Sequence, residues 1–169
     1  MKLAICFLLI LLFYNANSQA NKKQLLKTSK YAGVYSFGEN VEKGAVGSVF
    51  IYPETDSTVL FFIDVCRGAP SYNLGQLYDR LKIVNGKGIY FSNKYDNSDT
   101  QQGCKLQLTI HDQILTIKTL DNAGECGFGG NVTADNEFRL KDKKKPTCFI
   151  DGHNHKIFFS ETSPENYLK

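Results

Sequence analysis

The sequence predicts an all-β protein, a small antiparallel barrel or sandwich of about eight strands stapled by disulfide bonds. Short runs of alternating apolar and polar residues recur along the chain, and this period of two is typical of strands with one buried face. Clusters of Gly, Pro, Asn and Asp separate the runs, as turns require. Amphipathic helical patterns are almost absent, so a sheet must supply the core.

The central stretch, Cys104–Leu140, shows the strand pattern most clearly. Residues 105–110 and 114–119 alternate on either side of a short polar break and predict an antiparallel hairpin. A further run through Phe138 continues the inward alternation on the next strand. We therefore expect this stretch to form a compact part of the sheet.

The remaining strands follow from the same pattern. Thr58–Val65 (TVLFFIDV) is apolar on both faces in its middle, which places it centrally or beneath a second layer. Asn85-Gly86 lies between two alternating runs and is typical of a two-residue hairpin turn, so we expect its flanking strands to pair. The strands predicted outside the central stretch are 31–37, 46–52, 58–65, 77–84, 88–92, 147–150 and 156–159.

The first residues have the pattern of an export signal. Lys2 precedes an almost wholly apolar run, and small residues follow at the spacing that signal peptidase recognises. We expect residues 1–18 to be removed and the protein to be secreted or periplasmic. Residues 19–30 then form a leader, flexible or a short helix, residues 31–160 a single all-β domain, and residues 161–169 a tail with little to bury.

Cysteine usage agrees with an exported protein. Cys6 lies within the predicted signal, which leaves four cysteines and usually two disulfide bonds, with three possible connectivities. We favour Cys104–Cys126, because the intervening hairpin returns the chain, and Cys66–Cys148 then follows by elimination. The alternative for the second pair is two unbonded thiols that pack as small apolar groups.

The charged residues are nearly balanced, with a formal net charge of +3 at pH 7. That balance does not suggest a nucleic-acid partner, which normally meets a concentrated basic face. After the predicted signal no apolar run is long enough for a transmembrane helix, so we expect no membrane insertion. The motifs indicate no cofactor, and we expect a monomer.

The segment after the strand at 58–65 is the least regular part of the sequence, and it surrounds Cys66 with varied polar side chains. Loops of this kind beside a rigid strand usually carry binding function. We therefore predict a contact surface there, with the polar loop over residues 93–103 beside it. The structural alternative is an Asp–Arg ion pair that, with a disulfide, holds a long crossover. The predicted contact residues are Asp64, Arg67, Tyr72, Asn73 and Tyr95.

A second candidate site lies near the end of the chain. His153 and His155 are two positions apart and would share one face of a strand, where Asp151 could join them as a ligand for zinc or copper. The alternative is structural, because Asp151-Gly152 is also a natural turn for a hairpin at this point. Elsewhere the chain has no Gly-x-Ser-x-Gly elbow, no His-Glu-x-x-His and no phosphate loop, so we favour a non-catalytic protein.

The segment Cys126–Asp135 (CGFGGNVTAD), preceded by a hairpin that opens at Cys104, resembles a motif of small exported proteins from Bacteroidetes-type bacteria. In shape those proteins are similar to the disulfide-stapled β-barrels that include periplasmic lysozyme inhibitors. The resemblance covers roughly the central quarter of the chain and implies a barrel. The inhibitors' serine-containing recognition loop is not found here, so the resemblance implies no functional residue.

The function that these features favour is an exported non-catalytic binding protein. Its partner would be another protein, such as a cell-wall hydrolase that it inhibits, or a small ligand held in the barrel mouth. One alternative is a metal-dependent protein or hydrolase that uses the Asp151, His153 and His155 cluster. Another is a structural envelope protein without a discrete site.

Overall fold

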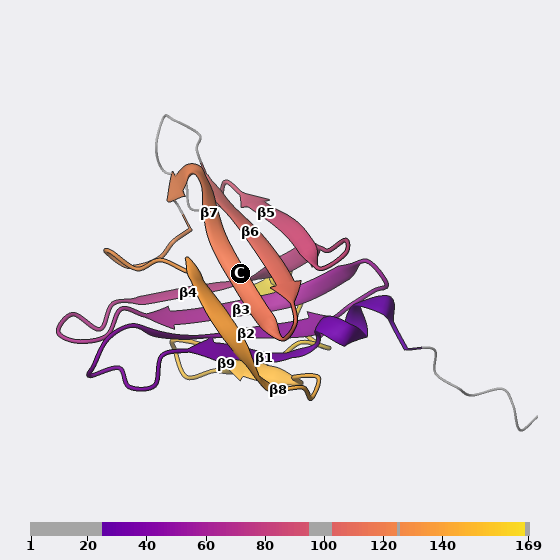
Figure 1. Ribbon diagram of the computed structural model, residues 1–169, viewed down its shortest axis with the longest axis horizontal. Coiled ribbons are helices and arrows are strands. Elements are labelled where there is room, and N and C mark those ends of the chain that lie inside the picture. Colours follow the sequence, from indigo (N-terminus) through magenta and orange to yellow (C-terminus); the bar gives the residue numbers. More distant parts are fainter. Residues whose placement is uncertain (1–24, 95–102, 125, 168–169) are drawn as a thin grey trace, which may run out of the picture.

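The computed structural model describes residues 25–94, 103–124 and 126–167 (Figure 1). Its elements in chain order are the 3-10 helix η1 (Lys27–Tyr31), the strands β1 (Gly33–Phe37), β2 (Val46–Pro53), β3 (Thr58–Cys66), β4 (Leu74–Lys82), β5 (Lys87–Ser92), β6 (Cys104–His111), β7 (Ile114–Gly124), β8 (Asn136–Asp142), β9 (Cys148–Ile150) and β10 (Lys156–Phe158), and the short helix α2 (Pro164–Tyr167). Within those ranges, no helix combines the length and the apolar character needed to span a bilayer.

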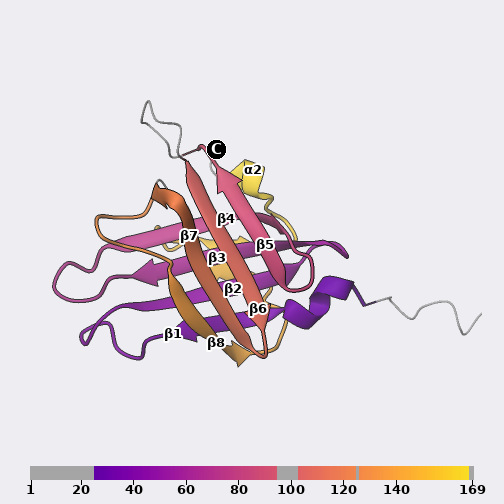
Figure 2. The same ribbon diagram turned by 45° about the horizontal axis from the view of Figure 1, so that its top comes forward.

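Eight of the strands form one antiparallel sheet in the order β4-β3-β2-β1-β8-β7-β6-β5. Except for β4 and β5, strands that follow each other in these eight are neighbours in the sheet, and the pairing of β1 with β8 curls the sheet round on itself. Figures 1 and 2 show β5, β6 and β7 crossing over β1 to β4. The all-β prediction is therefore confirmed, and the form it takes is a nearly closed up-and-down barrel.

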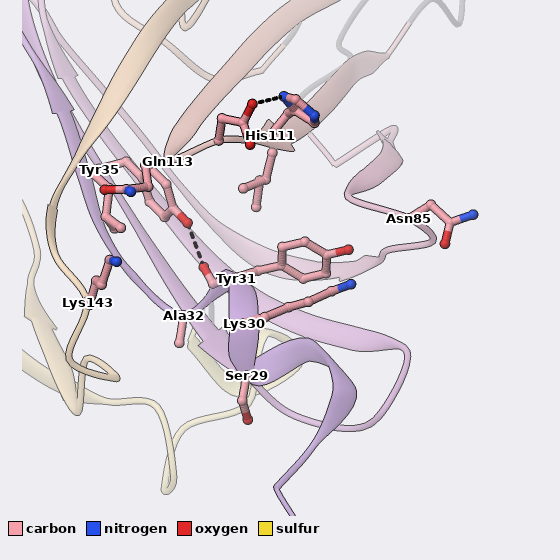
Figure 3. Close-up of a pocket in the computed structure, with 12 residues that line it drawn as sticks. Ser29, Lys30, Tyr31, Ala32, Tyr35, Asn85, His111, Gln113 and Lys143 are labelled. Atoms are coloured by element: carbon pink, nitrogen blue, oxygen red, sulfur yellow. Dashed lines mark hydrogen bonds and ion pairs between the residues drawn. The ribbon is translucent and has the colours of Figure 1, made fainter.

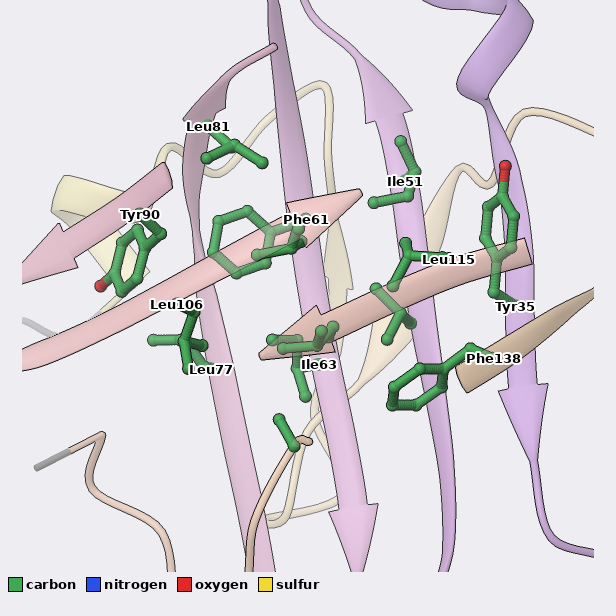
Figure 4. Packing of buried hydrophobic residues seen from close by; sticks show 14 of the residues in the cluster. Tyr35, Ile51, Phe61, Ile63, Leu77, Leu81, Tyr90, Leu106, Leu115 and Phe138 are labelled. Carbon is green, nitrogen blue, oxygen red and sulfur yellow. The ribbon is translucent and has the colours of Figure 1, made fainter. Parts of the chain in front are cut away.

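The barrel is open between β4 and β5, and here one prediction is wrong. Asn85-Gly86 does form the expected tight turn, with φ of +50° and +80°. The flanking strands, however, do not pair along their length. Within the described residues they share only the bridge between Val84 and Lys87, and then β4 pairs with β3 and β5 with β6. Side chains rather than backbone connect the two strands further along, since the Tyr90 hydroxyl of β5 donates to the Asp79 carboxylate of β4 at 2.9 Å. The Tyr90 ring lies in the inner core (Figure 4).

The two ends of the barrel are built differently. At one end, which we call the loop end, lie the long β1–β2, β3–β4 and β7–β8 loops. At the other, the η1 end, lie the short β2–β3, β4–β5 and β6–β7 turns together with η1. Helix η1 is fastened there by the Tyr35 hydroxyl, which donates a hydrogen bond of 2.9 Å to the Tyr31 carbonyl (Figure 3).

The interior of the barrel is a packed core rather than a channel. Alternate residues of every strand point inward, as the sequence predicts, and fill the space that eight strands enclose (Figure 4). The Phe61 and Tyr90 rings meet edge to face with centroids 5.3 Å apart, and Phe37 meets Phe138 in the same way at 4.9 Å. The hairpin at 105–119 forms as β6 and β7.

The chain itself closes the loop end. Residues 126–132, which we call the plug, belong to the connection between β7 and β8. They extend across the barrel mouth from β6 to β4, and Phe128 and Val132 pack against the inner core. Gly75 of β4 makes room for them, because a Cβ there would lie 2.6 Å from the Phe128 ring and 2.9 Å from a Val132 methyl group. A disulfide bond ties the first residue of the plug to the first residue of β6.

A second apolar cluster covers the outer face of β2, β3 and β4. Phe62 of β3 stacks on Phe149 of β9 with ring centroids 3.8 Å apart, and this explains why the strand at 58–65 is apolar on both faces. The tail after residue 160 also takes part, contrary to the prediction that it buries little. Pro164 is buried, and Tyr167 packs on the outer cluster.

Candidate binding surface at the loop end

The β3–β4 loop, where the sequence predicts a contact surface, is fastened on one side to the β1–β2 loop. The Ala69 N–H donates to the Val41 carbonyl at 3.0 Å, and the Tyr72 hydroxyl donates to the Glu42 carboxylate at 2.6 Å. Gly68, at φ +81°, allows the close approach, since a Cβ there would lie 2.7 Å from the Val41 oxygen. Two loops that are distant in sequence therefore form one unit.

On its other side the same loop is fastened to the plug. The Asn73 side-chain amide donates to the Gly130 carbonyl at 2.7 Å, and the Gly129 N–H donates to the Leu74 carbonyl at 2.9 Å. Because the plug is itself held by a disulfide and by two core side chains, the loop has a rigid support. We call the β1–β2 loop, the β3–β4 loop and the plug together the platform.

The platform presents an aromatic and an aliphatic side chain to solvent. Tyr72 is 43% exposed and Leu74 is 51% exposed. Tyr72 has φ +50°, a conformation that costs energy for a residue with a Cβ. Its N–H donates to the Gly68 carbonyl at 2.9 Å, and its bond to Glu42 raises the pKa of its hydroxyl. The ring is thus held outward by specific bonds.

The other predicted contact residues have different surroundings. Arg67 is exposed, and its N–H donates to the Asn73 carbonyl at 2.9 Å. Asp64 is half-buried on the outer face of β3, and its carboxylate accepts from the Gln76 side chain at 2.9 Å rather than pairing with Arg67. Tyr95 lies outside the described residues.

The histidine-containing turn between β9 and β10 adjoins this region. Gln76 connects the two, because it donates to Asp64 and accepts a hydrogen bond of 2.7 Å from the Gly152 N–H. The fold therefore brings the two sites predicted from sequence into contact through a residue that the sequence did not single out. Gln76 lies on a regular strand, and no sequence pattern distinguishes it from other polar strand residues.

The residues predicted to bind a metal, Asp151, His153 and His155, lie together in the turn between β9 and β10, and one Asp151 carboxylate oxygen lies 3.4 Å from Nδ1 of His155. Asp151 is buried, and one oxygen of its carboxylate accepts from the backbone N–H groups of His153 and His155 at 2.9 and 2.8 Å. Burial opposes ionisation of Asp151, but these two bonds outweigh it and hold its pKa below the usual value. Both imidazoles are exposed, and within the described ranges no group of three or more His, Cys, Asp or Glu residues is arranged to hold a metal ion. The carboxylate caps a turn.

One of the two predicted disulfide bonds is present. Cys104 and Cys126 are bonded and buried in the inner core. Cys66 and Cys148 are unbonded and half-buried, so that prediction is wrong and the alternative holds. On β9 the side chain of Phe149 faces the sheet, so the adjacent Cys148 points away from it. Phe149 contacts β3 at Phe62. Cys66 lies four residues further along β3, which is about 13 Å at 3.3 Å per residue.

No family model, no curated protein and no solved structure matches the chain. The resemblance to Bacteroidetes-type exported proteins and to lysozyme inhibitors stays a prediction.

Proposed function

We propose that this chain is an exported, non-catalytic binding protein whose platform engages a partner protein. The first partner to test is a cell-wall hydrolase of the lysozyme type, which the protein would inhibit by occupying its cleft. A small ligand, the alternative to a protein partner, would bind at the opposite end of the barrel, the η1 end.

One observation carries the proposal: the exposed Tyr72 and Leu74 belong to a loop that is hydrogen-bonded on both sides. Binding normally costs free energy to order flexible loops, and a surface ordered beforehand avoids part of that cost. Aromatic side chains at the centre of such a surface commonly supply most of the binding free energy. The platform combines these two properties.

Two features support export to an oxidising compartment. The N-terminal sequence has the charged, apolar and small-residue parts of a signal peptide. The Cys104–Cys126 bond fixes the plug, and structural disulfides of this kind persist outside the reducing cytosol. Both fit a protein that meets its partner in the periplasm or the medium.

The test measures binding to lysozymes of several types by calorimetry, together with their lytic activity. We expect the double variant Tyr72→Ala/Leu74→Ser to weaken binding at least about tenfold. The control is Val84→Ser/Ile89→Ser, which removes two comparably exposed apolar side chains, 59% and 55% exposed, outside the platform. Equal losses from the two variants would contradict the platform. If no lysozyme binds or loses activity, the inhibitor proposal fails.

A further inference from the structure

The η1 end of the barrel contains a pocket of about 650 Å³ that the platform does not use (Figure 3). Its apolar lining comes from Tyr31 of η1, Tyr35 of β1, Ile110 of β6 and Leu140 of β8. The volume lies within the range of roughly 300–1,000 Å³ that small-molecule sites occupy. Segments that are distant in sequence therefore line one recess of mixed polarity, large enough for a ring system or a short chain.

Two ammonium groups border this recess. Lys30 and Lys143 both line the pocket, and Figure 3 shows them on opposite sides of it. Neither takes part in an ion pair with any carboxylate of the described residues. The Lys30 ammonium lies 4.9 Å from the Tyr31 ring centroid, a cation–π distance that keeps it beside the aromatic wall.

One acidic residue, Asp112, also lines the pocket, and so does its partner His111. The Asp112 carboxylate lies 3.1 Å from Nδ1 of His111, at the tip of the β6–β7 turn. Two further exposed lysines lie on either side of Lys143, with Lys141 near the end of β8 and Lys144 just after it. An excess of positive charge around a recess raises the local concentration of anionic solutes.

Neutral hydrogen-bonding groups complete the rim. Asn85 and Gln113 line the pocket from the tips of two turns, with φ of +50° and +68°. The backbone fixes both turns, because the Ile110 N–H donates to the Gly86 carbonyl at 2.7 Å and the Leu140 N–H donates to the Gln113 carbonyl at 2.8 Å. The rim is therefore already in place before a ligand arrives.

From this arrangement we infer that the η1 end binds a small amphiphilic anion, a molecule with an apolar ring or short chain and a carboxylate, sulfonate or phosphate group. The apolar part contacts Tyr31 and Leu140. The anionic group lies at the rim between the ammonium groups of Lys30 and Lys143. This site does not depend on the platform, which lies at the other end of the barrel.

The test uses two probes with nearly the same aromatic body. One is 1-anilinonaphthalene-8-sulfonate, and the other is N-phenyl-1-naphthylamine, which lacks the sulfonate. We expect the full chain to bind one equivalent of the sulfonate, seen by fluorescence and calorimetry, and to bind the neutral probe at least about tenfold more weakly. Inorganic phosphate should compete poorly, because it has no apolar part. Equal binding of the two probes, or full displacement by phosphate at matched ionic strength, would overturn the inference.

Variants locate the site. The double variant Lys30→Gln/Lys143→Gln should weaken sulfonate binding on the order of tenfold, while binding of the neutral probe is unchanged. The matched control is Lys27→Gln/Lys144→Gln, which removes the same charge from nearby exposed positions that do not line the pocket. If the control weakens binding as much as the rim variant, the site is not this pocket.

A second kind of variant should bind the sulfonate probe more tightly than the wild type, a result that misfolding cannot produce. Asp112→Asn removes the one negative charge of the rim, and Asn accepts the positive φ of +46° at this position. We expect sulfonate binding to become a few-fold tighter, because the repulsion from the carboxylate is lost. Unchanged or weaker binding would count against the proposed position of the anionic group. The platform variant Tyr72→Ala/Leu74→Ser should bind both probes like the wild type.

Discussion

The two ends of this barrel differ in how they are closed. At the loop end, contacts between residues distant in sequence close the barrel. The plug fills the mouth, a disulfide bond ties it to β6, and hydrogen bonds join three connecting segments. At the η1 end, short turns and one small helix leave a pocket between them. The comparison shows how one sheet can provide a rigid surface at one end and a recess at the other.

The ends also differ in charge. The η1 pocket is lined by Lys30, Lys143 and Asp112, whereas the platform mixes Glu39 and Glu42 with Lys43 and Arg67. The nearly balanced net charge of the whole chain hides this difference, because it averages over both ends. A rigid surface of mixed polarity favours a protein partner, and a basic recess favours a small anion.

Removal of the disulfide should have the largest effect on stability. We expect Cys104→Ala/Cys126→Ala to lower the free energy of unfolding by roughly 3 kcal/mol, because the bond closes a loop of 22 residues in the unfolded chain. Denaturant titration measures the loss. The control Cys66→Ala/Cys148→Ala removes two unbonded thiols and should cost much less. If both double variants lost a similar free energy of unfolding, the disulfide bond would not be what stabilises the loop end.

Displacement of the plug should have the next largest effect. Gly75→Ala places a methyl group against Phe128 and Val132, and overpacking of this kind typically costs about 1–3 kcal/mol. Gly130→Ala is the control, since the nearest atom to its Cβ would be 3.6 Å away. We expect that control to stay within about 0.5 kcal/mol of the wild type. A tolerated Gly75→Ala would mean that the plug does not pack as described.

At the η1 end, Tyr35→Phe should cost about 1 kcal/mol, because it removes the hydrogen bond to the Tyr31 carbonyl. Burial raises the pKa of Tyr35 from 10.0 to about 12, so the hydroxyl contributes fully below pH 10 and progressively less as the pH rises towards 12. The stability of the wild type should therefore fall more steeply over that interval than that of the variant. Parallel curves of unfolding free energy against pH would contradict the burial of this hydroxyl.

Tyr72→Ala should have the smallest effect on stability, within about 0.5 kcal/mol, although it should weaken binding to a partner. The ring is exposed, and its hydroxyl bond to Glu42 lies in solvent. Thermal unfolding of the variant and the wild type measures the difference. A large loss of stability would mean that the residue supports the fold rather than a contact surface.

Local pattern predicts much of this barrel. The alternation in residues 105–119 corresponds to β6 and β7, and the doubly apolar strand at 58–65 lies between the inner core and a second layer. The Cys104–Cys126 bond follows from a hairpin that returns the chain. Each of these features depends on residues near one another in sequence or on the period of a strand.

Features that depend on the path of the whole chain were not predictable. The strands around Asn85-Gly86 diverge beyond a single bridge, and the Asp151 carboxylate accepts from two backbone N–H groups of its own turn. The η1 pocket combines residues 29–35, 85, 110–113 and 140–143, a set that only the closed sheet brings together. Gln76 joins two predicted sites in the same way.

The most direct test of a preformed platform is amide hydrogen exchange of the protein without any partner, measured by NMR. We expect the N–H groups of Ala69, Tyr72 and Gly129, which donate hydrogen bonds within the platform, to exchange at least about a hundredfold more slowly than in an unstructured peptide. In Cys104→Ala/Cys126→Ala, protection at Gly129 should fall first. Exchange at the unstructured rate for all three amides, with the barrel strands still protected, would contradict the account.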